Sequence, residues 1–154
     1  MGIRPSHIFT ATGSCGTQAG LLMGLRYFGN SSTQVIGISV SASRERLEER
    51  TRNVIGMISE VSDIPHDIVG DREIIINDEH IGTGYGRPSV AGVAAIRMVA
   101  ENEGVILDPI YTGKAMSGML DLIRKGALDN ARDVVFLHTG GAPAIHPYAE
   151  FLRT

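Results

Sequence analysis

Residues 8–17 read Ile-Phe-Thr-Ala-Thr-Gly-Ser-Cys-Gly-Thr, and an amphipathic run follows them as far as Gly29. The apolar and β-branched residues 8–11 predict a buried strand, and apolar residues at helical spacing within 21–28 predict a helix. A strand that turns through glycine into a helix aims several free backbone N–H groups and the positive end of the helix dipole at one point. The pattern is therefore typical of a phosphate site, and equally of a tight turn in which Thr17 caps the helix.

Strand-like and helix-like segments alternate along the rest of the chain. We expect further strands at 34–40, 73–77 and 133–138, and helices that begin after residues 41–43, at Pro88 and near Thr112. This alternation predicts a single α/β domain over residues 1–154, with a three-layer, open, mainly parallel sheet and helices on both faces. Ligands of such sheets bind beyond the carboxyl ends of the strands, so we expect the glycine-rich turns at 13–16, 113 and 140–141 to share one cleft.

The composition is that of an ordinary globular protein, with 43% hydrophobic and 20% charged residues among 154. A net charge of −3 gives no electrostatic case for binding nucleic acid or an anionic membrane. No apolar run approaches bilayer length. Cys15 is the single cysteine, so no internal disulfide can form and we expect a reducing, cytoplasmic location. The five histidines lack zinc-ligand spacing, so we expect no metal site.

Residues 44–52 are densely charged. Four arginines (Arg44, Arg46, Arg50 and Arg52) are interleaved with three glutamates (Glu45, Glu48 and Glu49). Charges of both signs on one predicted helix form salt bridges at a spacing of three or four residues. We interpret this segment as a solvated face of the helix and not as a binding patch.

Four motifs occur in order along the chain. They are Ala-Thr-Gly-Ser-Cys-Gly-Thr-Gln-Ala-Gly at 11–20, Gly-Tyr-Gly at 84–86, Leu-Asp-Pro-Ile-Tyr-Thr-Gly-Lys-Ala at 107–115 and His-Thr-Gly-Gly-Ala-Pro at 138–143. Together they resemble the D-cysteine desulfhydrase / 1-aminocyclopropane-1-carboxylate (ACC) deaminase family of pyridoxal-phosphate (PLP) enzymes. The resemblance extends from Ile8 to about Pro147. It implies part of the large domain of PLP fold type II, the tryptophan-synthase-β-like fold, with PLP as the cofactor.

The resemblance also implies roles for individual residues. The implied cofactor-binding residues are Gly13, Ser14, Cys15, Gly16, Thr17, Thr112, Thr139 and Gly140. Residues 13–17 would cradle the phosphate, and Thr139 would place a hydroxyl beside the pyridine nitrogen. Tyr85 and Tyr111 match two catalytic tyrosines that lie near the substrate and the pyridine ring. Without the resemblance, Tyr85 is equally a solvent-facing loop residue and Tyr111 a core aromatic with a hydrogen-bonded hydroxyl.

Two threonines distinguish branches of the family. ACC deaminases carry Glu where this chain has Thr112 and Leu where it has Thr139, so the chain is more similar to the D-cysteine desulfhydrases. The implied reaction is α,β-elimination on a small amino acid, which converts D-cysteine to pyruvate, sulfide and ammonia. ACC deaminase activity, L-cysteate sulfo-lyase activity and a non-catalytic PLP- or phosphate-binding module are the alternatives.

PLP chemistry of this kind needs a lysine that forms a Schiff base with the cofactor. The chain has only Lys114 and Lys125, placed at the start and the end of one predicted helix, and neither position suits that role. In the family the lysine lies in an N-terminal half that has no counterpart here. The resemblance therefore implies that the chain is the C-terminal part of such an enzyme and is inactive alone. The full-length enzyme is expected to be a homodimer, with a complementing N-terminal half as a possible partner of this chain.

Two further hypotheses come from the residues alone. A Rossmann-like nucleotide site is disfavoured because residues 13–16 do not form the G-x-G-x-x-G pattern. A hydrolase that uses Cys15 at the helix N-terminus is open, since that position can lower the pKa of a thiol. It would need a histidine, and His138 qualifies only if the fold brings it close.

Overall fold

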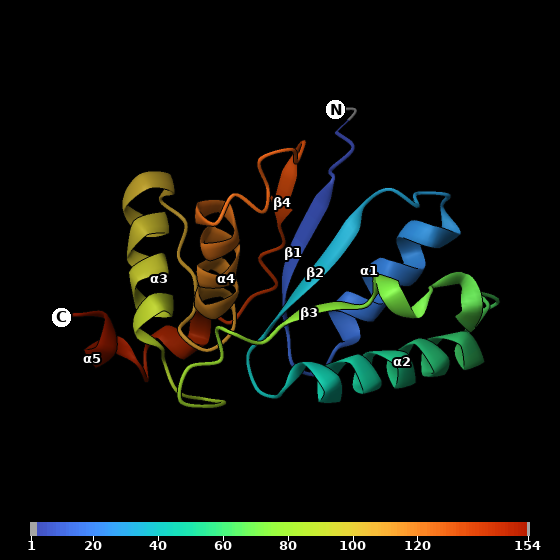
Figure 1. Cartoon of the computed structure of the whole chain (residues 1–154). Coiled ribbons are helices and arrows are strands. Elements are labelled where there is room, and N and C mark those ends of the chain that lie inside the picture. The colour runs from blue at the N-terminus through green and yellow to red at the C-terminus, as the bar shows by residue number, and fades with distance from the viewer. Residues whose placement is uncertain (1–2, 154) are drawn as a thin grey trace.

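A parallel four-stranded sheet forms the centre of the computed structural model, which describes residues 3–153 (Figure 1). The strands are β1 (His7–Thr12), β2 (Gln34–Ser39), β3 (Ile75–Asn77) and β4 (Val134–Phe136), in the spatial order β3-β2-β1-β4. Strand β1 pairs with β2 on one side and β4 on the other, so that Ile8 lies opposite both Val35 and Val135. The expected parallel sheet is confirmed.

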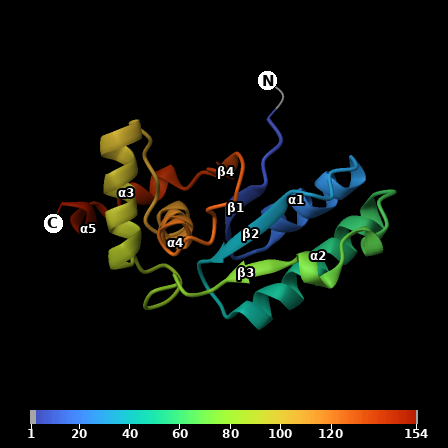
Figure 2. The same ribbon diagram turned by 45° about the horizontal axis from the view of Figure 1, so that its top comes forward.

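Helices cover both faces of this sheet (Figure 2). The helices are α1 (Gly16–Tyr27), α2 (Arg44–Val61), α3 (Val90–Glu103), α4 (Thr112–Arg124) and the short α5 (Ala149–Leu152), with 3-10 turns at His66–Ile68, Asp71–Glu73 and Ala142–Ile145. Helices α1 and α2 pack on one face and α4 on the other, while α3 packs on α4. The expected three-layer α/β architecture is confirmed. Within residues 3–153, no helix combines the length and the apolar character needed to cross a membrane.

The described residues form three core clusters, of which one lies between α3 and α4 and the other two flank the sheet, because the central strands are buried on both faces. Val35 and Ile76 pack with Leu22 of α1 and Leu47 of α2. On the other face, Phe9, Ile38 and Ala115 form a second cluster beneath α4. A strand covered on both sides reads as a nearly continuous apolar run, and this explains the sequence of β2, whereas β1 buries Thr10 and Thr12 beside its apolar residues.

Three boundaries differ from the expectation. Strand β3 begins at Ile75 and not at residue 73, because Glu73 belongs to a 3-10 turn and its carboxylate accepts a hydrogen bond from the backbone of Gly70 at 2.7 Å. Helix α3 begins at Val90, two residues after Pro88, with Ser89 as its N-cap. Strand β4 is limited to Val134–Phe136.

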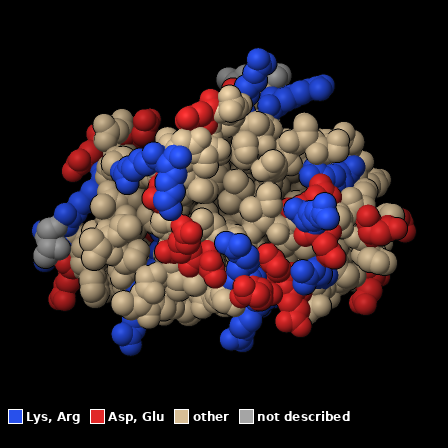
Figure 3. Space-filling view, viewed as in Figure 1, with Lys and Arg blue, Asp and Glu red and all other residues tan. Residues whose placement is uncertain are grey.

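Lysines, arginines and acidic residues are interspersed over the face shown in Figure 3, in keeping with the net charge of −3. The salt bridges of Arg52 with Glu48 and Asp71 belong to this mixed surface.

Close packing of α4 on β2 generates a test of the fold. A Cβ atom on Gly118 would lie 2.9 Å from Cδ1 and Cγ2 of Ile38. Gly118→Ala is therefore expected to lower the free energy of unfolding by about 1–3 kcal/mol through overpacking. The matched control is Gly20→Ala in α1, where a Cβ atom meets nothing within 4 Å. It should stabilise the protein by ~0.5–1 kcal/mol through helix propensity. Urea denaturation measures both, and equal effects would contradict this packing.

Candidate functional site

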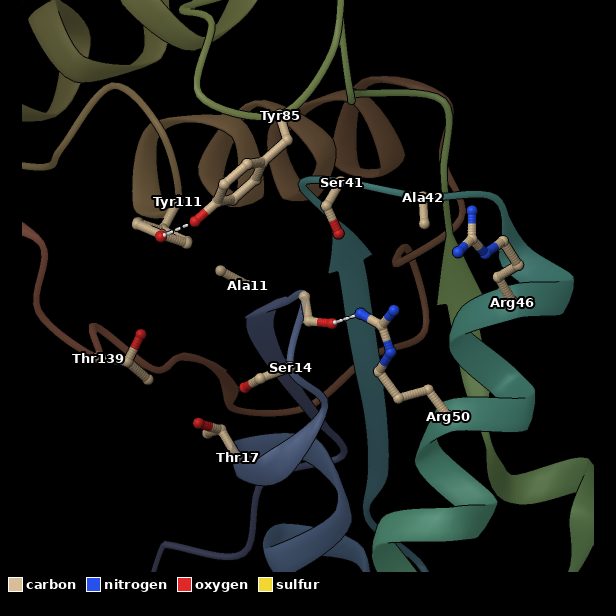
Figure 4. A pocket seen from close by; sticks show the side chains of 11 residues that line it. Ala11, Ser14, Thr17, Ser41, Ala42, Arg46, Arg50, Tyr85, Tyr111 and Thr139 are labelled. Carbon is tan, nitrogen blue, oxygen red and sulfur yellow. Dashed lines mark hydrogen bonds between the residues drawn. The ribbon is translucent and has the colours of Figure 1, made fainter.

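A cavity of about 570 Å³ lies beyond the carboxyl ends of the strands (Figure 4). Its lining residues come from the segments that follow β1, β2, β3 and β4 and from the start of α4: Ala11, Gly13, Ser14, Thr17, Ser41, Ala42, Arg46, Arg50, Tyr85, Tyr111 and Thr139. From β1 the chain adds β2 and β3 on one side of the sheet, and β4 is then added on the other side of β1. The strand order therefore reverses at β1, and the cavity lies at this point. Open parallel sheets place their ligand sites at such points.

The turn between β1 and α1 presents hydrogen-bond donors to this cavity. Cys15 is the N-cap of α1 in the left-handed conformation, with φ of 70°, and no side chain caps the helix. The first backbone N–H groups of α1 consequently lack an intrahelical or side-chain acceptor. Ser14 and Thr17 line the cavity beside them. Gly13 is packed closely, since a Cβ atom there would lie 3.2 Å from Cγ2 of Val40.

Two arginines of α2 add positive charge to the same wall. Arg50 donates a hydrogen bond from Nη1 to the carbonyl oxygen of Gly13 at 2.6 Å, and Arg46 lines the cavity one helical turn earlier. The interpretation of residues 44–52 as a solvated face therefore does not extend to Arg50, whereas Arg46 is exposed and Arg52 pairs with Glu48 and Asp71. The i, i+4 spacing of Arg46 and Arg50 was the available signal, because it places both side chains on one side of the helix. None of the lining residues is acidic.

A pair of tyrosines forms another wall of the cavity. The hydroxyl oxygens of Tyr85 and Tyr111 lie 2.5 Å apart, and their rings meet edge to face with centroids 6.1 Å apart (Figure 4). The hydrogen bond with Tyr85, with burial as a second cause, raises the pKa of Tyr111 to about 12. Tyr111 is therefore protonated at neutral pH. The uncharged pair can donate or accept a hydrogen bond at a phenolic oxygen.

Asp108 fixes the backbone that carries Tyr111. Its fully buried carboxylate accepts hydrogen bonds from the backbone N–H groups of Ile110, Tyr111 and Thr112 at 2.7–2.8 Å. These bonds cap the first turn of α4, a position where a negative charge also favours the helix dipole. The loop after β4 lies against this cap, since a Cβ atom on Gly141 would lie 2.5 Å from Cγ of Asp108.

The structure brings together only part of the predicted set. Gly13, Ser14, Thr17, Tyr85, Tyr111 and Thr139 line one cavity. Cys15, Gly16, Thr112 and Gly140 do not belong to its lining. Thr112 is fully buried and its hydroxyl binds Asp108 at 2.6 Å, so it is directed away from the cavity. Gly113, expected to share the cleft, is packed against Ile96 instead.

Cys15 does not have the surroundings of a nucleophile. Its side chain is 2% exposed and belongs to the core cluster beneath α1 and α2. Sγ lies 3.6 Å from the carbonyl oxygen of Leu47, and His138 makes its hydrogen bond to the carbonyl of Ile106 at 3.0 Å. The hydrolase hypothesis has no geometric support.

Both lysines lie away from the cavity lining. Lys114 is buried, and its ammonium donates to the carbonyl oxygens of Ile81 and Gly84. Lys125 is exposed and pairs with Asp121 at 2.7 Å and Glu79 at 3.2 Å. His80 joins these two carboxylates in a compact cluster that the sequence did not suggest. Because the Lys125 ammonium already contacts both carboxylates, the cluster is an ion-pair network.

Comparison with known proteins identifies the family. Residues 1–140 match the model of a family described as "Pyridoxal-phosphate dependent enzyme". The chain belongs to this family.

Individual relatives carry two names. An ACC deaminase of Burkholderia vietnamiensis is 34% identical over 153 residues, which are 99% of this chain and 45% of that protein. A D-cysteine desulfhydrase of Klebsiella pneumoniae is 37% identical over 143 residues, which are 93% of this chain and 42% of that protein. A crystal structure of an ACC deaminase homologue superposes with a TM-score of 0.85 at 35% identity and covers 99% of this chain and 44% of its own. The chain thus spans less than half the length of these relatives.

The donor set of the cavity fits the phosphate of PLP. Uncapped N–H groups, the hydroxyls of Ser14 and Thr17 and the guanidinium group of Arg50 lie at one end (Figure 4), and no carboxylate lines the cavity among the residues that the structure describes. The buried Oγ of Ser41 has no hydrogen-bond partner among the residues that the structure describes. This chemistry is suited to an anion.

The tyrosine pair provides a test of the site geometry that needs no ligand. Tyr85→Phe removes the hydrogen bond and should lower the pKa of Tyr111 from about 12 toward the ordinary value of about 10. At pH 11 the ionised fraction of Tyr111 would rise from about one tenth to as much as about nine tenths. The carbon NMR shift of Cζ in labelled tyrosine measures this fraction.

The sign of the effect on stability follows from the same shift. The folded-state pKa of Tyr111 lies above the unfolded one, so the stabilisation is fully present below pH ~10 and is lost as the pH rises toward 12. Tyr27→Phe, at an exposed tyrosine of α1, is the control and should leave Tyr111 unchanged. A pKa near 12 in Tyr85→Phe would show that burial alone raises it.

Proposed function

We propose that this chain contributes the phosphate cradle and the tyrosine pair to PLP-dependent α,β-elimination on a small amino acid. The observation that most strongly supports this proposal is the cavity at the reversal of strand order. It has a turn suited to an anion at one end and two phenolic hydroxyls at the other. Figure 4 shows Thr139 between these two ends in that view. A cofactor with a phosphate at one end and a reactive ring at the other matches this polarity.

Each end of the cavity has a separate task in this proposal. The N–H groups at the start of α1, with the hydroxyls of Ser14 and Thr17, bind the phosphate and fix its position. The Thr139 hydroxyl would be the partner of the pyridine nitrogen, and as a neutral group it would leave that nitrogen largely unprotonated. Tyr85 and Tyr111 orient the substrate and hold a proton at a phenolic oxygen. When bound, PLP supplies the electron sink that makes the Cα–H of an amino acid acidic.

D-cysteine is the substrate that we propose, with pyruvate, sulfide and ammonia as products. Thr139 supports this choice, because it lies in the cavity wall at the position where ACC deaminases carry Leu. Thr112 gives no such support, since its hydroxyl is bound to Asp108 outside the cavity. ACC deamination and L-cysteate sulfo-lysis are the competing reactions, and the relatives named ACC deaminase support the first.

A second candidate is binding of PLP without turnover by these residues alone. The observation that favours it is the position of the lysines, because neither Lys114 nor Lys125 lines the cavity. We propose that the lysine that holds the cofactor covalently lies outside these 154 residues, in the part of the relatives that the chain does not match. A homodimeric full-length enzyme and a cytoplasmic location are further proposals, which rest on the family resemblance and on the single cysteine.

Cofactor binding is tested first on this chain alone. PLP should bind reversibly in competition with inorganic phosphate, and Thr17→Ala should weaken binding about tenfold, the equivalent of one lost hydrogen bond of ~1.4 kcal/mol. Ser31→Ala, at an exposed position outside the cavity, is the matched control. Intact mass after borohydride reduction should show no pyridoxyl adduct on Lys114. A stoichiometric adduct there would contradict the assignment of the lysine to another segment.

The reaction is tested after the missing lysine is supplied. This chain is mixed with the N-terminal portion of the Klebsiella D-cysteine desulfhydrase, and D-cysteine, L-cysteate and ACC are offered in turn. Release of pyruvate and sulfide from D-cysteine is the expected result. Preferential formation of 2-oxobutanoate from ACC would assign the chain to the deaminases. Reversible PLP binding with no product from any of the three would favour the non-catalytic module.

A further inference from the structure

Lys114 is a buried cation that the proposed reaction does not use. It is the third residue of α4 and is fully buried. Its Nζ donates hydrogen bonds to the carbonyl oxygens of Ile81 at 2.7 Å and Gly84 at 2.9 Å. Among the ion pairs formed by residues 3–153, none involves Lys114.

This position is unfavourable for an ammonium group. Burial lowers the pKa of Lys114, and the positive end of the α4 dipole adds to the cost of the charge. No carboxylate among residues 3–153 forms an ion pair with this ammonium group. The two carbonyl oxygens therefore provide the stabilisation, and both belong to the loop that carries Tyr85.

That loop has little packing of its own. Every residue from 81 to 86 is at least partly exposed, and Gly82, Gly84 and Gly86 adopt φ of 70°, 137° and 74°. Left-handed glycines define a turn but contribute no side chain to a core. Side chains from elsewhere hold the loop instead: Lys114 at two carbonyls, Tyr111 at the Tyr85 hydroxyl and Tyr148 at the carbonyl of Gly86, 2.7 Å away.

Lys114 and Tyr111 form a two-point attachment between the same two segments. They are three residues apart at the start of α4, and their partners Gly84 and Tyr85 are adjacent in the loop. A movement of the loop that breaks the bond between Lys114 and Gly84 would therefore also move the Tyr85 hydroxyl relative to Tyr111. We propose that Lys114 is a positioning residue that holds the Tyr85 loop on α4 and so sets the Tyr85 hydroxyl on Tyr111. Its relevance to chemistry rests on the proposed function, whereas the contacts and the test below do not.

The tyrosine pair reports on this role directly. Lys114→Met keeps the length of the side chain and removes its donors, so the loop should lose its fixed position and the hydrogen bond between the tyrosines should weaken. The ionisation constant of Tyr111 should then rise toward that of Tyr85→Phe, by up to about a hundredfold for a change in pKa from about 12 to about 10. The double variant Lys114→Met/Tyr85→Phe should show no further rise. The Cζ signals of labelled tyrosines measure all three.

Lys125→Met is the matched control, because it removes the other lysine from the opposite end of the same helix. It should leave the titration of Tyr111 unchanged. A folded Lys114→Met protein, verified by its backbone amide spectrum, with wild-type titration of Tyr111 would overturn the proposal. Such a result would leave the proposed function intact, since PLP binding is measured separately.

A measurement on the wild-type chain covers the case in which Lys114→Met does not fold. The chain contains two lysines, so nitrogen-15 labelling of lysine gives two ammonium signals that Lys125→Met assigns. At pH 6 the ammonium protons of Lys114 should exchange with water at least about tenfold more slowly than those of Lys125, because they are buried and hydrogen-bonded. Equal exchange rates would overturn the proposal without the Lys114→Met variant.

Discussion

Parallel pairing of β1 with both β2 and β4 constrains where each loop of the site can lie. Parallel strands direct all their carboxyl ends to one edge, so segments more than a hundred residues apart in the chain meet there. The turn after β1 and the segment after β4 diverge around the reversal of strand order, which opens the space between them. The cavity is thus a consequence of topology before any particular side chain is considered. Side chains then determine what the cavity binds.

The chemical character of the cavity changes from one end to the other. At the α1 end, uncapped N–H groups and the guanidinium group of Arg50 favour an anion. At the α4 end, the Asp108 carboxylate accepts hydrogen bonds from backbone N–H groups and does not line the cavity. The uncharged phenolic hydroxyls of the tyrosine pair form this end instead. A positive end and a neutral end orient an elongated anionic ligand in one direction. This polarity supports PLP more strongly than the volume does.

Local sequence patterns predicted the elements and the helix-initiating turn at 13–17, whereas Tyr85, Tyr111 and Thr139 were expected at the site from the family resemblance alone. The apolar runs of β1 and β2 are buried on both faces, and the turn at 13–17 begins a helix as its glycines indicate. Tertiary contacts decided the rest. Thr112 was expected at the cofactor, but Asp108, four residues earlier, binds its hydroxyl. Arg50 was taken as solvated because the charge pattern does not show which face of α2 meets the cavity.

The Tyr85 loop shows why glycine-rich active-site loops need an external attachment. Three left-handed glycines allow the sharp turns that bring Tyr85 back over the cavity, yet they leave almost no apolar surface to bury. The conformational entropy lost by ordering such a loop has to be offset by directed bonds to a rigid element. Helix α4 is that element, because Asp108 fixes its first turn and Ile38 packs against it at Gly118. A buried ammonium with several donors can bind two carbonyl oxygens at once, which a neutral hydroxyl with its single proton cannot. Burial of the charged Lys114 side chain is electrostatically unfavourable, and in return its two hydrogen bonds keep the loop ordered.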